Sequence, residues 1–159
     1  GVGTMISQVN LESLRLANFD DAGGIKTLIE PLEKDGTLVR RGRDRIERDI
    51  DHFIVLEHDG ILWGCCALYP YPEQEMGELA CLVVHPSWQG TGDGERLLKK
   101  AELQARKQGL KKIFVLTTQT AHFFLKRGFV TGDVDQLPAE RKRIYDWSRK
   151  SRVLIKSLV

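Results

Sequence analysis

Residues 78–94 read ELACLVVHPSWQGTGDG, which combines a strand pattern, a glycine-rich turn and the start of a helix. Residues 78–84 carry a single charge among apolar side chains, which indicates a strand near the centre of a sheet. A turn with three glycines in five positions follows and leads into a pattern typical of a helix. The first amides of a helix have no partner within the helix, and glycines let an anion approach the backbone. The arrangement therefore favours an anion site, and its pattern Q-x-x-G-x-G matches neither a nucleotide P-loop nor a dinucleotide fingerprint.

Length and composition narrow the class of protein. The 159 residues are 42% hydrophobic, enough for one domain with a real core. A formal charge of +2 disfavours nucleic acid or membrane as the partner, and basic residues alternate with acidic ones. No apolar run is long enough to cross a bilayer. Three cysteines without a C-x-x-C pair and four scattered histidines favour reduced thiols, a cytoplasmic protein and no metal.

The periodicity of the remaining chain indicates mixed α and β structure. Residues 1–12 show no periodicity and read as a linker remnant, followed by one domain over 13–159. The apolar stripe of Leu97, Leu98, Ala101 and Ala105 predicts a helix over 94–107. Asp59-Gly60 predicts the turn of a hairpin within 52–71. The other expected elements are strands at 13–17, 78–84, 111–118 and within 144–158, and helices within 19–32, 42–50 and 121–129.

Two segments resemble the signatures of the GNAT acetyltransferase superfamily. VHPSWQGTGDGERLL (84–98) is similar to its acyl-coenzyme A pyrophosphate loop, [RQ]-x-x-G-x-[GA], and FFLKRGF (123–129) to its second signature. The resemblance runs from about Leu14 to Val153. It implies an α+β GNAT fold, with a mixed, mostly antiparallel central sheet flanked by helices, and acetyl-CoA as co-substrate. The cofactor-binding residues that it implies are Leu82, Val84, Gln89, Gly90, Thr91, Gly92, Asp93, Gly94 and Phe124.

Four further segments resemble the acetyltransferase domain of bacterial N-acetylglutamate synthases. They are PLEKDGTLVRR (31–41), GELACLVVHP (77–86), KIFVLTTQTAHFFLKRGF (112–129) and RKSRVLIKSL (149–158). This resemblance implies acetyl transfer from acetyl-CoA to the α-amine of L-glutamate, the first step of arginine biosynthesis. In that family an amino-acid-kinase-like domain carrying arginine feedback inhibition precedes this one. We expect that domain to be missing upstream of the opening GVGTMISQ, and the full-length enzyme to be a homo-oligomer.

The chemistry requires a base for the amine proton and benefits from an acid for the leaving thiolate. Glu78 is the best candidate for the base, because it is the carboxylate at the start of the strand that leads to the glycine turn. Many GNAT enzymes place a tyrosine beside the thioester sulfur, but Phe124 stands there and has no proton to donate. The resemblance to the synthases favours Thr117 as the acid. Thr117 and Thr118 would otherwise simply cap the next helix.

Two carboxylates of glutamate need cationic partners in a closed site. Of the adjacent Arg40 and Arg41, at most one need point inward, and the resemblance favours Arg41. Arg149 is expected in the final strand with Ser151 on the same face, and Cys81 is expected to offer main-chain groups where the central strand splays. The other basic side chains of the tail, Arg141 among them, are expected to be mostly solvated.

Asp93 places a negative side chain inside the expected phosphate loop, so its carboxylate is expected to point to solvent.

Two other functions remain open at this point. One is a GNAT enzyme that acetylates another amine, although arginines placed for two carboxylates argue against a polyamine. The other is a non-catalytic CoA-binding regulatory domain, which the phenylalanine at position 124 leaves possible.

Overall fold

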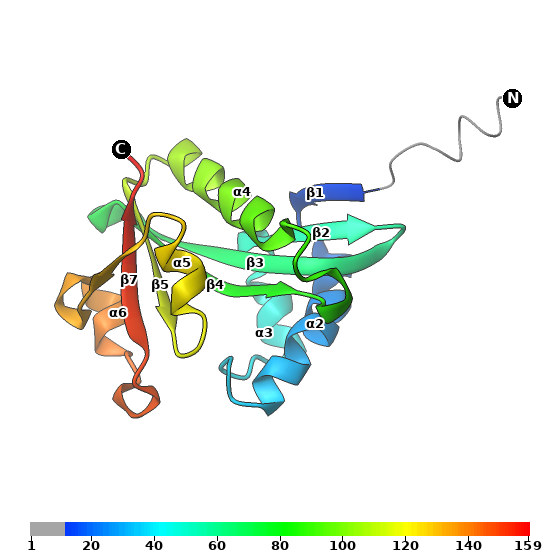
Figure 1. Ribbon diagram of the computed structural model, residues 1–159, viewed down its shortest axis with the longest axis horizontal. Helices are drawn as coiled ribbons and strands as arrows, with labels where there is room; N and C mark the ends of the chain where they lie inside the picture. Colours follow the sequence, from blue (N-terminus) through cyan, green and yellow to red (C-terminus); the bar gives the residue numbers. More distant parts are fainter. Residues whose placement is uncertain (1–11) are drawn as a thin grey trace, which may run out of the picture.

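The computed structural model describes residues 12–159, which form one mixed sheet with helices on both faces (Figure 1). The linker expected over 1–12 lies outside the described residues except for Glu12, which is the first residue of β1. Across the described residues, no helix combines the length and the apolar character that crossing a membrane requires.

Seven strands form the sheet in the order β1-β2-β3-β4-β5-β7-β6. Neighbouring strands are antiparallel except for the parallel pair β4 and β5. The expected α+β class, with a mixed and mostly antiparallel sheet, is therefore confirmed. The strands are β1 (Glu12–Leu16), β2 (Phe53–His58), β3 (Ile61–Tyr71), β4 (Met76–Val84), β5 (Lys112–Thr117), β6 (Val130–Gly132) and β7 (Arg152–Ser157).

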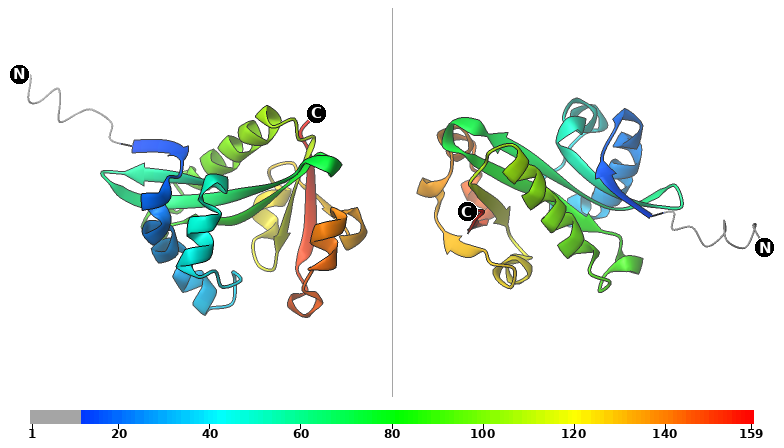
Figure 2. Two further views of the ribbon diagram at one scale, coloured as in Figure 1. Left: turned by 180° about the vertical axis from the view of Figure 1, so that it is seen from behind. Right: turned by 90° about the horizontal axis from the view of Figure 1, so that it is seen from above.

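Helices cover both faces of the sheet and enclose two main cores (Figure 2). One core lies beneath α4 and α5, and the other beneath α2 and α3. Strand β2 contributes to both, because Ile54 and Leu56 enter the first core while Phe53 and Val55 enter the second. The helices are α2 (Ala22–Lys34), α3 (Arg43–Arg48), α4 (Asp93–Lys107), α5 (Ala121–Leu125) and α6 (Ala139–Arg143).

Two local predictions are confirmed. The expected stripe of α4 is buried, with Leu97 and Ala101 both 0% exposed. The turn between β2 and β3 has positive φ at both central residues, 52° at Asp59 and 79° at Gly60. That backbone suits the right-handed twist of a two-residue hairpin, and Asp-Gly adopts it at low cost.

The expectation for the tail is wrong in its first half. Arg149 lies in a 3₁₀ turn (Trp147–Arg149), Lys150 is left-handed with φ of 55°, and β7 begins only at Arg152. The Asp146 carboxylate accepts from the Ser148 amide and stabilises this turn. Arg149 and Ser151 therefore do not share the face of a strand. Strand β6 and helix α6 were not expected from the sequence.

Strands β4 and β5 diverge near the middle of the molecule (Figure 1). They pair only where Met76, Gly77 and Glu78 lie beside residues 112–114. Further along β4 the register with β3 shifts, so that Cys81 and Leu82 both lie opposite Cys66. Cys81 adopts a left-handed conformation with φ of 54°. This β-bulge lies in the part of β4 that has no β5 partner, where the two strands separate.

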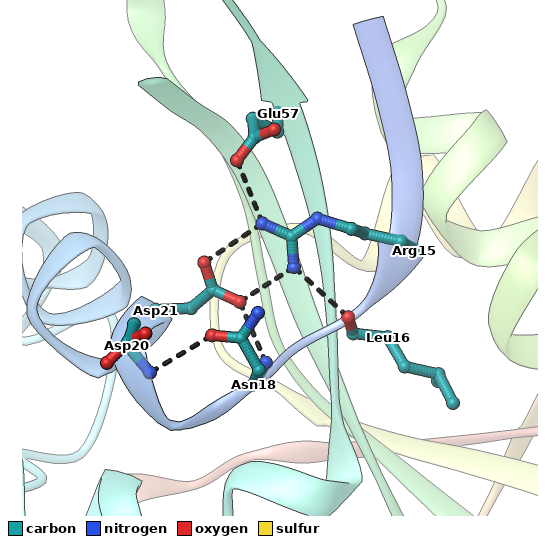
Figure 3. A network of polar contacts seen from close by, with 6 residues as sticks. All are labelled: Arg15, Leu16, Asn18, Asp20, Asp21 and Glu57. Atoms are coloured by element: carbon teal, nitrogen blue, oxygen red, sulfur yellow. Dashed lines mark hydrogen bonds and ion pairs between the residues drawn. The ribbon is translucent and has the colours of Figure 1, made fainter. Parts of the chain in front are cut away.

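An ion network joins β1, the turn that follows it and β2 (Figure 3). Arg15 donates to both carboxylate oxygens of Asp21, at 2.7 and 3.0 Å, and to Glu57 at 2.9 Å. The backbone N–H of Asn18 also donates to the Asp21 carboxylate, at 2.8 Å. The hydrogen bonds from Arg15 outweigh burial and lower the pKa of Asp21.

We expect Asp21→Asn to reduce the free energy of unfolding by about 1–2 kcal/mol at pH 7. Because the folded-state pKa of Asp21 is depressed, its contribution is complete above its unfolded pKa of about 3.9 and is lost as pH falls through the lower folded value. The difference between wild type and variant should therefore shrink below about pH 4. Urea unfolding between pH 7 and pH 2 measures it. Asp20→Asn, at the exposed neighbouring carboxylate, is the control and should change little.

Candidate active site

A pocket of about 580 Å³ opens at the glycine turn, and we call it the loop pocket. The end of β4, the turn, the start of α4 and helix α5 form its walls. Eight of the nine residues expected at the cofactor line it, and Thr91 is the exception. Its lining residues are Leu82, Val84, Trp88, Gln89, Gly90, Gly92, Asp93, Gly94, Glu95, Thr120, Phe123, Phe124 and Arg127.

The start of α4 offers free amides to the loop pocket. Gly92 precedes the helix with φ of 89°, a left-handed conformation that glycine adopts without strain. No side chain caps this end of the 15-residue helix. The first N–H groups and the positive end of the helix dipole are therefore available to an anion such as a pyrophosphate.

The expectation that Asp93 points to solvent is wrong, because Asp93 is only 4% exposed. Its carboxylate pairs with Arg96 at 3.0 Å and lies 2.9 Å from the Thr91 hydroxyl. That hydroxyl also lies 2.6 Å from the carbonyl oxygen of Trp88. Asp93 thus fastens the turn to the helix, and Arg96 balances its charge.

Arg127 is a lining residue that the sequence reading missed. It is the one cation among the described residues that line the loop pocket. Its guanidinium lies 3.8 Å from the centre of the Phe123 ring and donates to the Phe123 carbonyl at 2.9 Å. Its Nε is buried without a hydrogen-bond partner. A buried, unsatisfied donor of this kind favours an anionic ligand. The second signature contains Arg127, so the signal was present in the sequence.

Gly92→Ala should weaken CoA binding by at least about tenfold, which corresponds to about 1.4 kcal/mol. A Cβ at this position has no protein atom within 4 Å, so it would occupy space available to the ligand. Isothermal titration calorimetry with CoA measures the loss. Gly109→Ala is the matched control, because Gly109 has φ of 77° and equally open surroundings but lies at the far end of α4. Equal affinity in both variants would contradict phosphate binding at this turn.

A second pocket, of about 390 Å³, lies where β4 and β5 separate, and we call it the strand pocket. It collects four guanidinium groups, from Arg41, Arg45, Arg141 and Arg149, together with the carboxylates of Glu78 and Asp146. Five expected site residues line it, namely Arg41, Glu78, Cys81, Arg149 and Ser151. The two pockets meet along β4, because residues 78–81 line the strand pocket while Leu82 and Val84 line the loop pocket.

Glu78 is buried at 8% exposure, and its Oε1 accepts from Nε of Arg141 at 2.8 Å. The expectation that Arg141 is solvated is wrong, since its side chain is only 20% exposed. Arg141 belongs to α6, 63 residues from Glu78 along the chain. Local sequence patterns carry no signal for a pairing over that distance.

Hydrogen bonds to its backbone fix the position of Arg41. The carboxylate of Glu33 accepts from the Arg41 amide at 2.6 Å, and Lys26 donates to the Arg41 carbonyl at 2.7 Å. Lys26 and Glu33 are themselves an ion pair at 2.6 Å. The Arg41 side chain then enters the strand pocket with its Nε buried and unpartnered, while the neighbouring Arg40 is exposed.

Arg149 joins the tail to the loop between α2 and α3. One of its terminal nitrogens donates to the carbonyls of Thr37, at 3.1 Å, and Gly36, at 3.3 Å. Ser151 lies beside it, and its carbonyl accepts from the Tyr145 hydroxyl at 2.6 Å. Two segments distant in sequence thus close the strand pocket together.

Thr117, like Thr91, is an expected site residue that lines neither pocket. Its hydroxyl accepts from the Thr120 amide at 3.0 Å and lies 2.9 Å from the Thr120 hydroxyl. Thr117 thus holds the turn before α5, whose N-cap residue is Thr120 and whose start has no side-chain cap. Phe124 lines the loop pocket and packs edge-on against Phe123 and Phe129. Within residues 12–159, no group of three or more His, Cys, Asp or Glu side chains could hold a metal ion.

Comparison with known families agrees with this geometry. Residues 49–131, just over half of the chain, match the model of the acetyltransferase (GNAT) domain. The chain belongs to the GNAT acetyltransferase family. The matched residues run from before β2 into β6 and therefore include the glycine turn, α4, Glu78 and α5.

Several GNAT proteins similar to this chain are named for amino-acid acetylation. An amino-acid acetyltransferase of Ralstonia nicotianae is 63% identical over 158 residues, which are 99% of this chain and 35% of that protein. N-acetylglutamate synthase of Neisseria gonorrhoeae, solved with coenzyme A and N-acetyl-glutamate, superposes with a TM-score of 0.90 at 42% identity, over 93% of this chain and 35% of that one. Its structure with coenzyme A and L-arginine gives 0.83 at 40% identity, over 93% and 33%. The chain thus spans about a third of the length of these relatives.

Proposed function

We propose that this chain transfers the acetyl group of acetyl-CoA to the α-amine of L-glutamate, giving N-acetyl-L-glutamate and CoA. One observation carries the proposal: a pocket with several guanidinium groups and a buried carboxylate adjoins, along a single strand, a pocket built for a phosphate-bearing ligand. The solved synthase of Neisseria gonorrhoeae, complexed with coenzyme A and N-acetyl-glutamate, supports both ligands.

The charge of the strand pocket favours a dicarboxylic amino acid. A guanidinium stays protonated at ordinary pH and binds a carboxylate through two parallel hydrogen bonds. Arg41 and Arg149 line the pocket from segments far apart in the sequence, so the two guanidinium groups can bind two different carboxylates. A polyamine would be repelled by the same residues, which disfavours that alternative substrate.

Glu78 is the base in this proposal. Glu78 takes a proton from the ammonium group of bound glutamate, directly or through a water molecule, and later releases it to solvent. The resulting neutral amine attacks the thioester carbonyl carbon, and a C–N bond forms as the carbonyl oxygen gains negative charge. The nitrogen then loses its second proton to solvent, the C–S bond breaks and the CoA thiolate leaves. Main-chain N–H groups at the Cys81 bulge are suited to stabilise the oxyanion.

The acetyl group passes directly between the substrates in this scheme. Burial raises the pKa of the Cys81 thiol to about 11, so it stays protonated at neutral pH and is a poor nucleophile. An acetyl-cysteine intermediate is therefore not part of the proposal. Thr117 remains the proposed proton donor to the thiolate, and its hydroxyl must turn away from Thr120 to reach the sulfur.

A cytoplasmic location, a kinase-like domain upstream and a homo-oligomeric full-length enzyme belong to the same proposal.

A thiol-release assay with acetyl-CoA and a panel of amino acids and amines tests the proposal. We expect rapid CoA release with L-glutamate and little with glutamine, aspartate or spermidine. Comparable release with another amine would assign a different substrate. Tight CoA binding without release for any acceptor would favour a non-catalytic CoA-binding domain.

A further inference from the structure

The β4 bulge holds a backbone conformation that needs support. Cys81 has φ of 54°, which costs a residue other than glycine about 1–3 kcal/mol. The register shift leaves Cys81 and Leu82 opposite the single residue Cys66 of β3. Contacts around the bulge must therefore keep its peptide groups in this orientation.

The thiol of Cys65 makes such a contact. Cys65 is 0% exposed, and its Sγ donates to the carbonyl oxygen of Cys81 at 3.5 Å. Burial raises the pKa of Cys65 well above its usual value, so the thiol keeps the proton that it donates. The thiol is therefore protonated at neutral pH and can donate this hydrogen bond.

Cys65 also determines where the next amide points. In a planar trans peptide the carbonyl and the following N–H point in opposite directions. Because the Cys81 carbonyl is directed at Cys65, the Leu82 N–H is directed away from it. Cys65 and Cys81 belong to the core beneath α2 and α3, whereas Leu82 packs against the core beneath α4 and lines the loop pocket.

We propose that Cys65 is a positioning residue for acetyl transfer: its buried S–H holds the Cys81 carbonyl and thereby directs the Leu82 N–H at the thioester carbonyl oxygen. This inference rests on the proposed function, because it names the group that orients the oxyanion donor. Cys65 touches neither substrate. It acts through the orientation of one peptide group.

The kinetic test compares two adjacent buried thiols. Cys65→Ala should lower kcat about fivefold to tenfold with an unchanged KM for acetyl-CoA, which is less than the roughly 10²–10³ lost when an oxyanion donor is removed outright. Cys65→Ser keeps a donor and should restore kcat to within about threefold of wild type. Cys66→Ala is the matched control, since Cys66 is also 0% exposed and faces the bulge across the strand pair, but its Sγ contacts the Leu97 carbonyl at 3.9 Å instead of the Cys81 carbonyl. Equal losses of kcat in the two alanine variants would overturn the proposal.

A spectroscopic test needs no acceptor amine. The infrared stretch of a ¹³C-labelled acetyl carbonyl in bound acetyl-CoA should shift to lower frequency in wild type, Cys65→Ser and Cys66→Ala. The frequency should be higher in Cys65→Ala and in Cys65→Val, because neither side chain donates a hydrogen bond. The valine variant fills the space of the thiol and serves as the test if the alanine variant does not fold. An unchanged frequency in the donor-free variants would refute the role of Cys65. Absence of glutamate acetylation by wild type would refute the proposed function and leave the infrared comparison interpretable.

Discussion

Glu78→Gln should lower the maximal rate of glutamate acetylation by roughly 10²–10⁴-fold and leave CoA binding nearly unchanged. The substitution preserves the shape of the side chain and a hydrogen-bond acceptor for Arg141, but it removes the base. Raising the pH should restore part of the rate, because a larger share of the amine is then already neutral. Steady-state kinetics between pH 6 and pH 10, together with calorimetric CoA binding, measure both effects.

Glu102→Gln provides a closely matched control for this experiment. Glu102 is a carboxylate at 6% exposure, paired with Lys156 at 2.8 Å, whereas Glu78 has 8% exposure and its pair with Arg141 also measures 2.8 Å. Both substitutions remove one buried ion pair, but Glu102 faces neither pocket. Loss of stability should therefore be similar, and loss of rate should be confined to Glu78→Gln. A full rate in Glu78→Gln across this pH range would assign the base to another group.

Glutamine should be a poorer substrate than glutamate by about tenfold to a hundredfold in kcat/KM, or roughly 1.4–3 kcal/mol. The two amino acids have nearly the same size but differ by one charge. With glutamine, one guanidinium of the strand pocket faces a neutral amide, and a charge-assisted pair becomes an ordinary hydrogen bond. The site then retains a buried charge without compensation, which is how such sites reject an analogue.

Arginine substitutions show which side chain recognises the charge. Arg41→Ala and Arg149→Lys should each reduce the glutamate-to-glutamine ratio of kcat/KM, because an ammonium does not replace a planar two-pronged donor. Arg40→Ala and Arg152→Lys are the controls, as both side chains are exposed neighbours outside the strand pocket. An arginine whose replacement leaves the ratio unchanged does not bind a carboxylate of the substrate. The KM for acetyl-CoA should stay constant in all four variants.

The loop pocket was largely predictable and the strand pocket only in part. Eight of the expected cofactor residues line the loop pocket, and seven of them come from the continuous segment 82–94, whose strand end, turn and helix start are local structure. The role of Asp93 was missed, although Arg96, three residues later, is its neighbour on the helix surface. Arg149 and Ser151 reach the strand pocket as expected, although through a turn rather than through an extended strand.

The features that arise within a few residues could be predicted from the amino-acid sequence. These are the Asp59-Gly60 hairpin, the buried stripe of α4 and the glycine turn with its uncapped helix start, since strand alternation, helix periodicity and left-handed turns are local properties. The pair of Arg141 with Glu78 across 63 residues and the contact of Arg149 with Thr37 across 112 arise from the tertiary fold alone. The cause is that the partners of a buried charge depend on which distant segments the sheet brings together, and a one-dimensional pattern holds no information about that proximity.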